Sequence, residues 1–230
     1  MRTIVIGDIH GCFNELKTLI LSLEEKQEYN KDTDKLVFLG DYIDRGEDSR
    51  AVIKFIRERQ KDNKNVIALK GNHEDMLTDF CSNDKSEDWF YNGYESTLQS
   101  YKGFKEDFYN DIEWIKTLPL YYEDKYFIYA HAGVDVNKPI NKQSYYDLLW
   151  IREEFIYNTT PYAKRVIFGH TPTIRLTGEN KPVYTYTDNI AIDTGCVFGG
   201  ALTALIIEDD NVVKYYQAER EINEESQYWD

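Results

Sequence analysis

The sequence has little cysteine and little proline, and it has no long apolar run. Its three cysteines, Cys12, Cys81 and Cys196, are odd in number and far apart, and no CxxC motif is present, which excludes a disulfide framework. Such sparse cysteine usage is typical of reduced cytosolic proteins. No segment approaches the roughly 18 apolar residues of a membrane helix, and the apolar run at 3–6 is far too short for a signal peptide. We therefore expect a cytoplasmic protein with no membrane partner.

Positive charge is also scarce. The 230 residues include 27 Lys and Arg against 41 Asp and Glu, which gives a formal net charge of −14. This balance argues against a protein that coats nucleic acid through bulk attraction, so we expect no nucleic-acid partner. Hydrophobic residues make up 42% of the chain, which is enough for a packed core and excludes a disordered chain.

The first half of the chain alternates strand and helix patterns. Three apolar, β-branched segments at 3–6, 35–39 and 65–69 are typical of buried strands. Between them, the segments 13–25 and 50–59 carry apolar residues at helical spacing. Buried strands separated by helices predict a parallel sheet with right-handed crossovers.

The rest of the chain divides into a helical part and a strand-rich part. Residues from about 74 to 117 are helical and aromatic in pattern and are predicted to form a small cap. Short strands are then predicted at 125–130, 165–168, 182–186, 190–192, 201–207 and 212–216. The last two should form a hairpin. Because the chain has no repeat and no Pro/Gly/Ser-rich linker, we predict one α/β domain over 1–218, with two packed sheets flanked by helices, and an acidic C-terminal tail at 219–230.

Polar residues of the kind that bind metals follow each early strand. Each strand stops at a glycine and is followed by two such residues: Asp8 and His10, Asp41 and Asp44, and Asn72 and His73. In an open α/β sheet, ligands gather beyond the carboxyl ends of parallel strands. The three loops should therefore converge on one site.

Histidine is rare, and its placement is informative. All four histidines directly follow a predicted strand: His10, His73, His131 and His170. Carboxylate, imidazole and amide oxygen together suit Mn²⁺, Fe or Zn²⁺. There are more ligands than one ion needs, which favours two divalent ions about 3.5–4 Å apart, an arrangement that recurs in enzymes that cleave phosphoesters.

Each motif also has a simpler interpretation when taken alone. An Asp at a strand end is usually a helix N-cap or a turn former, and Gly-Asn-His-Glu at 71–74 could be a turn that opens a helix. The alignment of all these motifs on strand ends favours the joint site.

At this point the motifs resemble a known family. Gly7-Asp8-Ile9-His10-Gly11, the segment 40–46 (Gly-Asp-Tyr-Ile-Asp-Arg-Gly) and Gly-Asn-His-Glu at 71–74 are similar to the three signatures of metallophosphoesterases. The Asp-Arg-Gly form resembles the phosphoprotein phosphatase branch, especially small bacterial and lambda-type serine/threonine phosphatases. The resemblance covers nearly the whole chain, and it implies an α/β/β/α sandwich of two mixed sheets and a metal-dependent phosphatase, preferably with manganese.

The resemblance also implies a role for each site residue. One metal would be held by Asp8, His10 and Asp41, and the second by Asp41, Asn72, His131 and His170. Arg45 and Arg152 would bind phosphate oxygens, helped by Asn72. A metal-bridging hydroxide would attack phosphorus in line, and His73 would protonate the leaving alkoxide, with Asp44 raising its pKa and fixing its tautomer.

Several single residues keep a second interpretation. Arg152 could form a surface ion pair with Glu153 or Glu154, and Asp193 could simply end a strand. The aromatic residues of 89–109 favour packing inside the cap. Lys70 stands where some relatives carry Arg, which leaves its part in phosphate binding open.

Two competing functions also remain. A symmetrical diadenosine tetraphosphate hydrolase would share the Gly-Asp-x-His-Gly and Gly-Asn-His motifs, and a broad phosphoesterase would accept small esters; Asp44 with His73 favours a phosphorylated protein or peptide as the substrate. A metal-free scaffold on this fold should have lost ligands, whereas every expected ligand is present.

Overall fold

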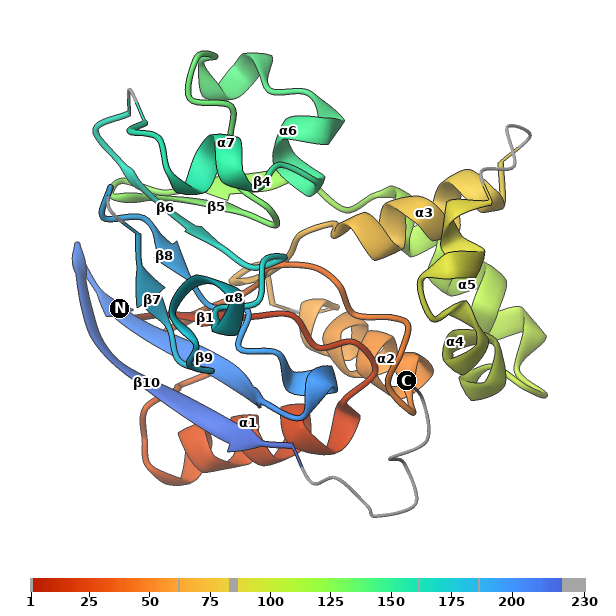
Figure 1. Ribbon diagram of the computed structural model, residues 1–230. Helices are drawn as coiled ribbons and strands as arrows, with labels where there is room; N and C mark the ends of the chain where they lie inside the picture. The colour runs from red at the N-terminus through yellow and green to blue at the C-terminus, as the bar shows by residue number, and fades with distance from the viewer. Residues whose placement is uncertain (1, 62, 83–86, 161, 186, 221–230) are drawn as a thin grey trace.

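The computed structural model describes the whole chain except residues 1, 62, 83–86, 161, 186 and 221–230, and its described strands form two sheets (Figure 1). The strands are β1 (Arg2–Ile6), β2 (Lys35–Phe38), β3 (Val66–Ala68), β4 (Tyr121–Glu123), β5 (Phe127–Ala130), β6 (Arg165–Phe168), β7 (Val183–Tyr184), β8 (Ile190–Ala191), β9 (Ala201–Glu208) and β10 (Asn211–Glu219). The helices are α1 (Phe13–Glu25), α2 (Ser49–Gln60), α3 (Asn72–Phe80), α4 (Tyr94–Ser100), α5 (Lys105–Lys116), α6 (Tyr145–Leu149), α7 (Glu153–Ile156) and α8 (Ile174–Thr177), with short 3₁₀ turns η1 (Asp88–Tyr91), η2 (Ile140–Lys142) and η3 (Cys196–Phe198).

The first sheet has the strand order β10-β9-β1-β2-β3. Strands β1, β2 and β3 are parallel, which confirms the prediction from the alternating pattern. Helix α1 has the bounds predicted for it, and α2 is longer than predicted by one residue at each end, since the Asp48 side chain caps it by accepting from the Ala51 amide. The predicted hairpin of β9 and β10 adds antiparallel to β1 and makes the sheet mixed.

The second sheet has the order β4-β5-β6-β8-β7, with a parallel centre and an antiparallel strand at each edge. Strand β4 was not predicted, because three residues are too few to show an alternating pattern. The strand predicted from residue 125 begins instead at Phe127. The Asp124 carboxylate accepts hydrogen bonds from the amides of Tyr126 and Phe127, which makes this segment a turn.

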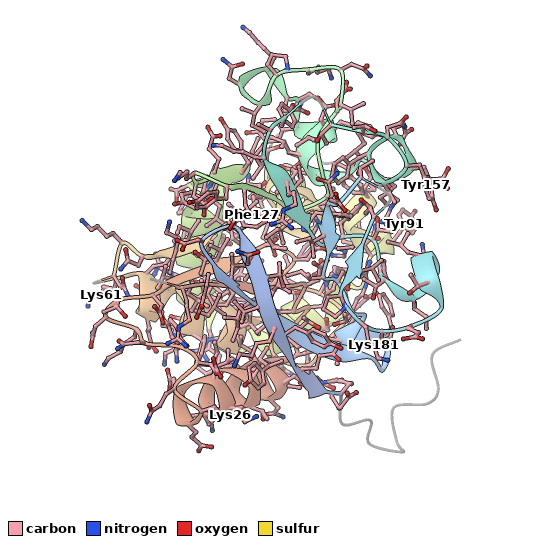
Figure 2. The ribbon with its side chains drawn as sticks, turned by 90° about the vertical axis from the view of Figure 1, so that its left-hand side faces the viewer. Lys26, Lys61, Tyr91, Phe127, Tyr157 and Lys181 are labelled. Atoms are coloured by element: carbon pink, nitrogen blue, oxygen red, sulfur yellow. The ribbon has the colours of Figure 1, made fainter. Side chains whose placement is uncertain are left out.

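Three apolar clusters show how the layers stack. One cluster lies between the sheets and joins Val5 and Leu205 of the first sheet to Phe127 and Ile167 of the second. Phe127, which is labelled in Figure 2, is fully buried. A second cluster packs α1 and α2 under the first sheet, and a third packs α6 and α7 on the second. The expected α/β/β/α sandwich is therefore confirmed.

The segment predicted as a cap is helical and contains α3, η1, α4 and α5, which lie together to one side of the sheets (Figure 1). Trp89 is buried there and contacts Phe80 and Tyr94, as expected for aromatic packing, although Tyr91 is 81% exposed.

The first two residues of the tail expected at 219–230 belong to the folded domain. Glu219 ends β10, and Arg220 forms ion pairs with Glu15 and Glu47. The rest of that segment, 221–230, lies outside the described residues. Within the part of the chain that the structure describes, no helix is both long and apolar enough to cross a membrane.

Candidate metal centre

The loops after β1, β2 and β6 bend sharply, and five predicted site residues lie at these bends. Left-handed backbone is rare for residues other than glycine and costs about 1–2 kcal/mol per residue. Among the described residues other than glycine, eight have positive φ, and five of these belong to the predicted site: His10 (46°), Asp41 (51°), Asp44 (72°), Arg45 (70°) and His170 (61°). Strain of this kind clusters at functional sites, where the surrounding structure enforces it.

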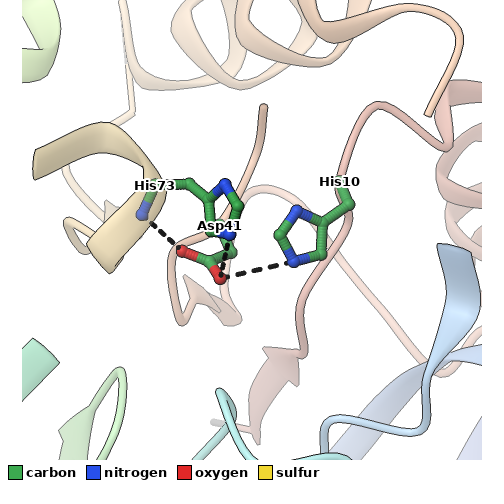
Figure 3. A group of neighbouring side chains, drawn as sticks. All are labelled: His10, Asp41 and His73. Atoms are coloured by element: carbon green, nitrogen blue, oxygen red, sulfur yellow. Dashed lines mark hydrogen bonds and ion pairs between the residues drawn. The ribbon is translucent and has the colours of Figure 1, made fainter. Parts of the chain in front are cut away.

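Asp41 lies at the centre of the site. Its Oδ2 is 3.3 Å from His10 Nε2 and 4.0 Å from His73 Nε2, and its Oδ1 is 3.3 Å from His131 Nε2. The His73 backbone amide also donates to Asp41 Oδ1 at 3.1 Å (Figure 3). Residues from different strand-end loops therefore meet at one carboxylate, as the placement on parallel strand ends predicted.

His131 shows why this cluster suits a cation. Its Nδ1 donates to the Leu39 carbonyl at 3.0 Å, and burial lowers the pKa of His131 to about 4. The ring is therefore neutral at neutral pH, and Nε2 carries a lone pair. That lone pair faces two other acceptors, Asn72 Oδ1 at 2.8 Å and Asp41 Oδ1 at 3.3 Å. Three acceptors without a shared proton repel one another unless a positive ion lies among them.

His10 has the same orientation, because its Nδ1 donates to the Ile43 carbonyl at 2.8 Å and leaves Nε2 facing Asp41. This arrangement is typical of histidines that bind metals, in which one nitrogen is fixed by the backbone and the other faces the ion. His170 donates from Nδ1 to Asn72 Oδ1 at 3.0 Å. Its buried Nε2 has no hydrogen-bond partner among the described residues.

A cluster of buried carboxylates also favours a bound cation. Burial, with the charges of Asp193 and Asp41, raises the pKa of Asp8 well above its usual range. Asp8 Oδ2 accepts from the His170 amide at 3.0 Å, but the buried Oδ1 has no partner within the described chain. Burial and the Asp41 charge likewise raise the pKa of Glu74 to about 8. A bound divalent ion would relieve this repulsion and give Asp8 Oδ1 a partner.

The potential ligands form two groups that share Asp41. One joins His10, Asp41 and His73, and the other joins Asp41, His131 and His170. Two groups with a common carboxylate could hold two ions, and Asp41 would be a ligand in both. The first group contains His73 by distance, whereas the family resemblance places Asp8 there and keeps His73 free. The unpartnered Asp8 Oδ1 favours that assignment.

His73 and Asp44 form the hydrogen-bonded pair that the sequence suggested. The His73 Nδ1 atom donates to Asp44 Oδ2 at 2.7 Å, and both side chains are buried. This bond fixes the tautomer and directs Nε2 toward Asp41. The pKa differs from the expectation, since burial lowers the pKa of His73 and outweighs the opposing effects of Asp41 and of the bond to Asp44.

Both predicted phosphate-binding arginines lie at this site. Arg45 Nη1 donates to His10 Nε2 at 2.8 Å, and its guanidinium lies 5.3 Å from the ring centre of Phe198. Arg152 Nη1 donates to the His170 carbonyl at 3.1 Å and to Thr171 Oγ1 at 3.0 Å. Arg152 is thus directed toward the site, and the alternative of a surface pair with its neighbours Glu153 or Glu154 is not what the structure shows.

Glu74 lies beside the site and was treated by sequence reasoning only as part of a motif. Its buried carboxylate accepts from the backbone amides of Gly71, Asp41 and Tyr42 at 2.8–2.9 Å. It thereby holds the loop after β2 against the start of α3. A Glu three residues after the capping position of a helix is the sequence signal that could have found it.

Trp89 and Thr97 were missed because they reach the site from the cap. Thr97 Oγ1 donates to Asp44 Oδ1 at 2.6 Å, and Trp89 Nε1 donates to both Asp44 oxygens at 3.0 and 3.1 Å. With His73, these donors fix the Asp44 carboxylate in one orientation. Both residues position His73 through Asp44 and do not face the metal groups themselves.

Replacing Thr97 with Val keeps the shape of the side chain and removes the hydroxyl donor to Asp44. Hydrogen bonds to charged groups contribute about 1.5–3 kcal/mol, so kcat on an alkyl phosphate should fall by about tenfold or more, while KM stays unchanged. The alkaline limb of the kcat–pH profile, where a general acid loses its proton, should move as well. Steady-state kinetics over pH measures both effects.

Two further variants serve as controls for this experiment. Thr97→Ser restores the hydroxyl and should recover the rate. Thr78→Val removes a cap hydroxyl that donates only to the Asp75 carbonyl, and it should leave the pH profile unchanged. A Thr97→Val enzyme with wild-type kcat and pH profile would show that Thr97 only packs.

The fold and the site together define a class of protein: two mixed sheets with helices outside, and a carboxylate and histidine centre at the strand ends. The chain belongs to the calcineurin-like phosphoesterases, whose family model matches residues 1–216. Members of this family are metal-dependent hydrolases that use a divalent dinuclear centre. The protein is therefore a phosphoesterase.

Two curated relatives show the range of the similarity. The chain is 32% identical over 229 residues to the asymmetrical bis(5′-nucleosyl)-tetraphosphatase PrpE of Oceanobacillus iheyensis, covering 89% of this chain and 88% of the relative. It is 29% identical over 212 residues to serine/threonine-protein phosphatase 1 of Salmonella typhimurium, covering 89% and 91%.

A solved structure supports the fold alone. The chain superimposes on a protein serine/threonine phosphatase from Saccharomyces cerevisiae with a TM-score of 0.66 and 14% identity, covering 97% of this chain and 81% of the other.

Proposed function

We propose that the protein is a phosphomonoester hydrolase that removes phosphate from serine and threonine side chains of proteins or peptides. The observation that carries this proposal is the buried His73–Asp44 pair, whose free Nε2 lies beside Asp41. A serine or threonine alkoxide is a poor leaving group and needs a proton donor. The phosphate leaving group of an anhydride linkage is more stable and depends far less on a proton donor.

The proposed metal ligands are those at which unshared acceptors converge: Asp8, His10, Asp41, Asn72, His131 and His170. Two Mn²⁺ ions suit this mixture of carboxylate, imidazole and amide oxygen, and Fe or Zn²⁺ would also fit. When bound, such ions lower the pKa of the attacking water and polarise the phosphoryl oxygens.

His73 is the proposed general acid. Because Nδ1 donates to Asp44, only the doubly protonated ring carries a proton on Nε2, and this proton, on the side of Asp41, is the one that His73 would deliver. Asp44 then stabilises the ring in the tautomer needed for the next cycle. Burial keeps bulk water from competing for this proton.

Arg45 and Arg152 are proposed to bind the phosphate, with help from the Asn72 amide. The Arg45 guanidinium lies beside His10 and the Arg152 guanidinium beside His170, so each is next to one of the two groups of proposed metal ligands. Planar guanidinium groups match the geometry of phosphate oxygens and stabilise the charge that spreads over them during transfer. A cation on His10 Nε2 would compete with Arg45 for that lone pair and would leave Arg45 able to bind substrate.

A second candidate substrate is a dinucleoside tetraphosphate. The relative in Oceanobacillus iheyensis, at 32% identity, carries the name of an asymmetrical hydrolase of this kind. That name differs from the symmetrical type weighed from the sequence. Asymmetrical cleavage of diadenosine tetraphosphate yields a nucleoside triphosphate and a monophosphate, whereas symmetrical cleavage yields two diphosphates.

A substrate panel with Mn²⁺ tests the proposal. Phosphoserine and phosphothreonine peptides, phosphotyrosine peptides, nucleotides and diadenosine tetraphosphate should be compared by kcat/KM. The highest value is expected for phosphoserine or phosphothreonine peptides. A much higher value for diadenosine tetraphosphate would instead assign the chain to the second candidate, and the product pair would give the cleavage mode.

A further inference from the structure

A second group of ligand-type side chains lies outside the metal centre already described. Cys12, Glu15 and Cys196 each offer one ligand atom, and these atoms lie within 4.8 Å of one another. All three residues are buried, with exposed fractions of 0%, 4% and 2%. The Sγ atoms of Cys12 and Cys196 lie within 4.8 Å of each other, and Cys12 Sγ donates to the His10 carbonyl at 3.6 Å. Cys12 precedes α1, Glu15 lies in its first turn, and Cys196 begins η3, so the group joins two segments that are distant in the sequence.

Glu15 supplies a second, independent observation. Its Oε1 accepts a hydrogen bond from Arg220 Nη1 at 2.9 Å. Its Oε2 is buried and has no hydrogen-bond partner among the described residues. A buried carboxylate oxygen without a partner is strongly disfavoured. Two buried cysteines alone would be explained by packing, but packing does not explain this oxygen.

We propose that Cys12, Glu15 and Cys196 bind a Zn²⁺ ion that is distinct from the ions of the catalytic centre. Two thiolates and a carboxylate are ligands that zinc accepts in proteins. With zinc–sulfur distances of about 2.3 Å and zinc–oxygen distances of about 2.0–2.2 Å, tetrahedral ligand atoms lie about 3.8 Å apart or closer. The ligand atoms lie within 4.8 Å of one another, so they would draw together by up to about 1 Å on binding the ion.

The buried charges of the group balance when the ion is bound, and the second partner of Arg220, Glu47, is largely exposed to solvent. Binding releases one proton from each thiol, so the two thiolates and Glu15 oppose the ion and Arg220. Arg220 remains on Glu15 Oε1 and leaves Oε2 for the ion. Hydrogen bonds of this kind to a coordinating carboxylate are usual around metal sites. The ion would then tie the loop that carries His10 to the segment that follows Asp193.

Cobalt substitution tests the proposal on the full-length protein. Thiolate ligands give Co²⁺ an intense near-ultraviolet charge-transfer absorption, and the ligands proposed for the catalytic centre contain no sulfur. We expect this absorption in the wild type and its loss in Cys196→Ser. Zinc-loaded wild type should also contain one ion more per chain than Cys196→Ser by elemental analysis.

Two more variants make the result specific. Cys81→Ser removes a cysteine at the end of α3, outside the group, and should keep the absorption and the extra ion. Glu15→Gln preserves the shape of the side chain and serves if Cys196→Ser does not fold; it should weaken zinc binding and shift the cobalt spectrum. A folded wild type without the absorption would overturn the proposal. So would a zinc content equal to that of the variants, or a mass lower by two hydrogens that shows a Cys12–Cys196 disulfide.

Discussion

Replacing Asp41 with Asn is expected to abolish hydrolysis of both p-nitrophenyl phosphate and phosphopeptides. Asp41 is the carboxylate common to the two ligand groups, and it lies within 3.3 Å of both His10 and His131. Changes to partners that only support a metal ligand commonly cost about 10–100-fold. Loss of a ligand shared by two ions should therefore exceed about 100-fold on every substrate. The amide also cannot supply the charge that opposes two divalent ions.

Metal content must be measured together with the rate. The Asp41→Asn protein should bind fewer ions per chain than the wild type by elemental analysis, and circular dichroism should show that it remains folded. Asp48→Asn is a matched control, because Asp48 caps α2 and Asn caps helices equally well. Normal turnover by Asp41→Asn would refute the shared-ligand assignment.

Replacing His73 with Asn should produce a loss that depends on the leaving group. General acid catalysis contributes about 10²–10⁴-fold, so phosphoserine hydrolysis should slow by that range. A nitrophenolate leaves readily without a proton, and hydrolysis of p-nitrophenyl phosphate should be affected far less. The measurement is kcat for a series of esters whose leaving groups differ in pKa.

Asp44→Asn provides the companion test. The substituted amide would keep the shape of the side chain but would no longer hold the His73 tautomer by a charged acceptor. The loss in this variant should follow the same dependence on the leaving group, although it should be smaller. Equal losses on alkyl and aryl esters in His73→Asn would argue that His73 has another role, such as metal binding through Nε2.

The sequence predicted which residues lie together wherever their position depends on strand ends. The bounds of α1, the parallel order of β1 to β3 and the β9–β10 hairpin follow from apolar periodicity. Once the strands are parallel, their loops must meet at one edge of the sheet, and Asp8, Asp41 and Asn72 come together for that reason.

The sequence could not predict contacts that depend on how the cap packs. Trp89 and Thr97 are 45 and 53 residues from Asp44 in the chain, and no local pattern indicates that they meet it. The lowered pKa of His73 was missed for a related reason: the Asp44 partner is visible in the motif, whereas the extent of burial depends on the whole fold. Strand β4 was too short to show a pattern.

The hydrogen bonds from Trp89 and Thr97 to Asp44 have an evolutionary consequence. Substitutions in η1 or α4 that move Trp89 or Thr97 also change the orientation of the Asp44–His73 pair. The packing of this helical segment is therefore linked to the proton donation that we propose for His73. A relative that replaces this segment must keep two donors to Asp44 by other residues. Without them, we expect it to be restricted to esters and anhydrides whose leaving groups depart without a proton.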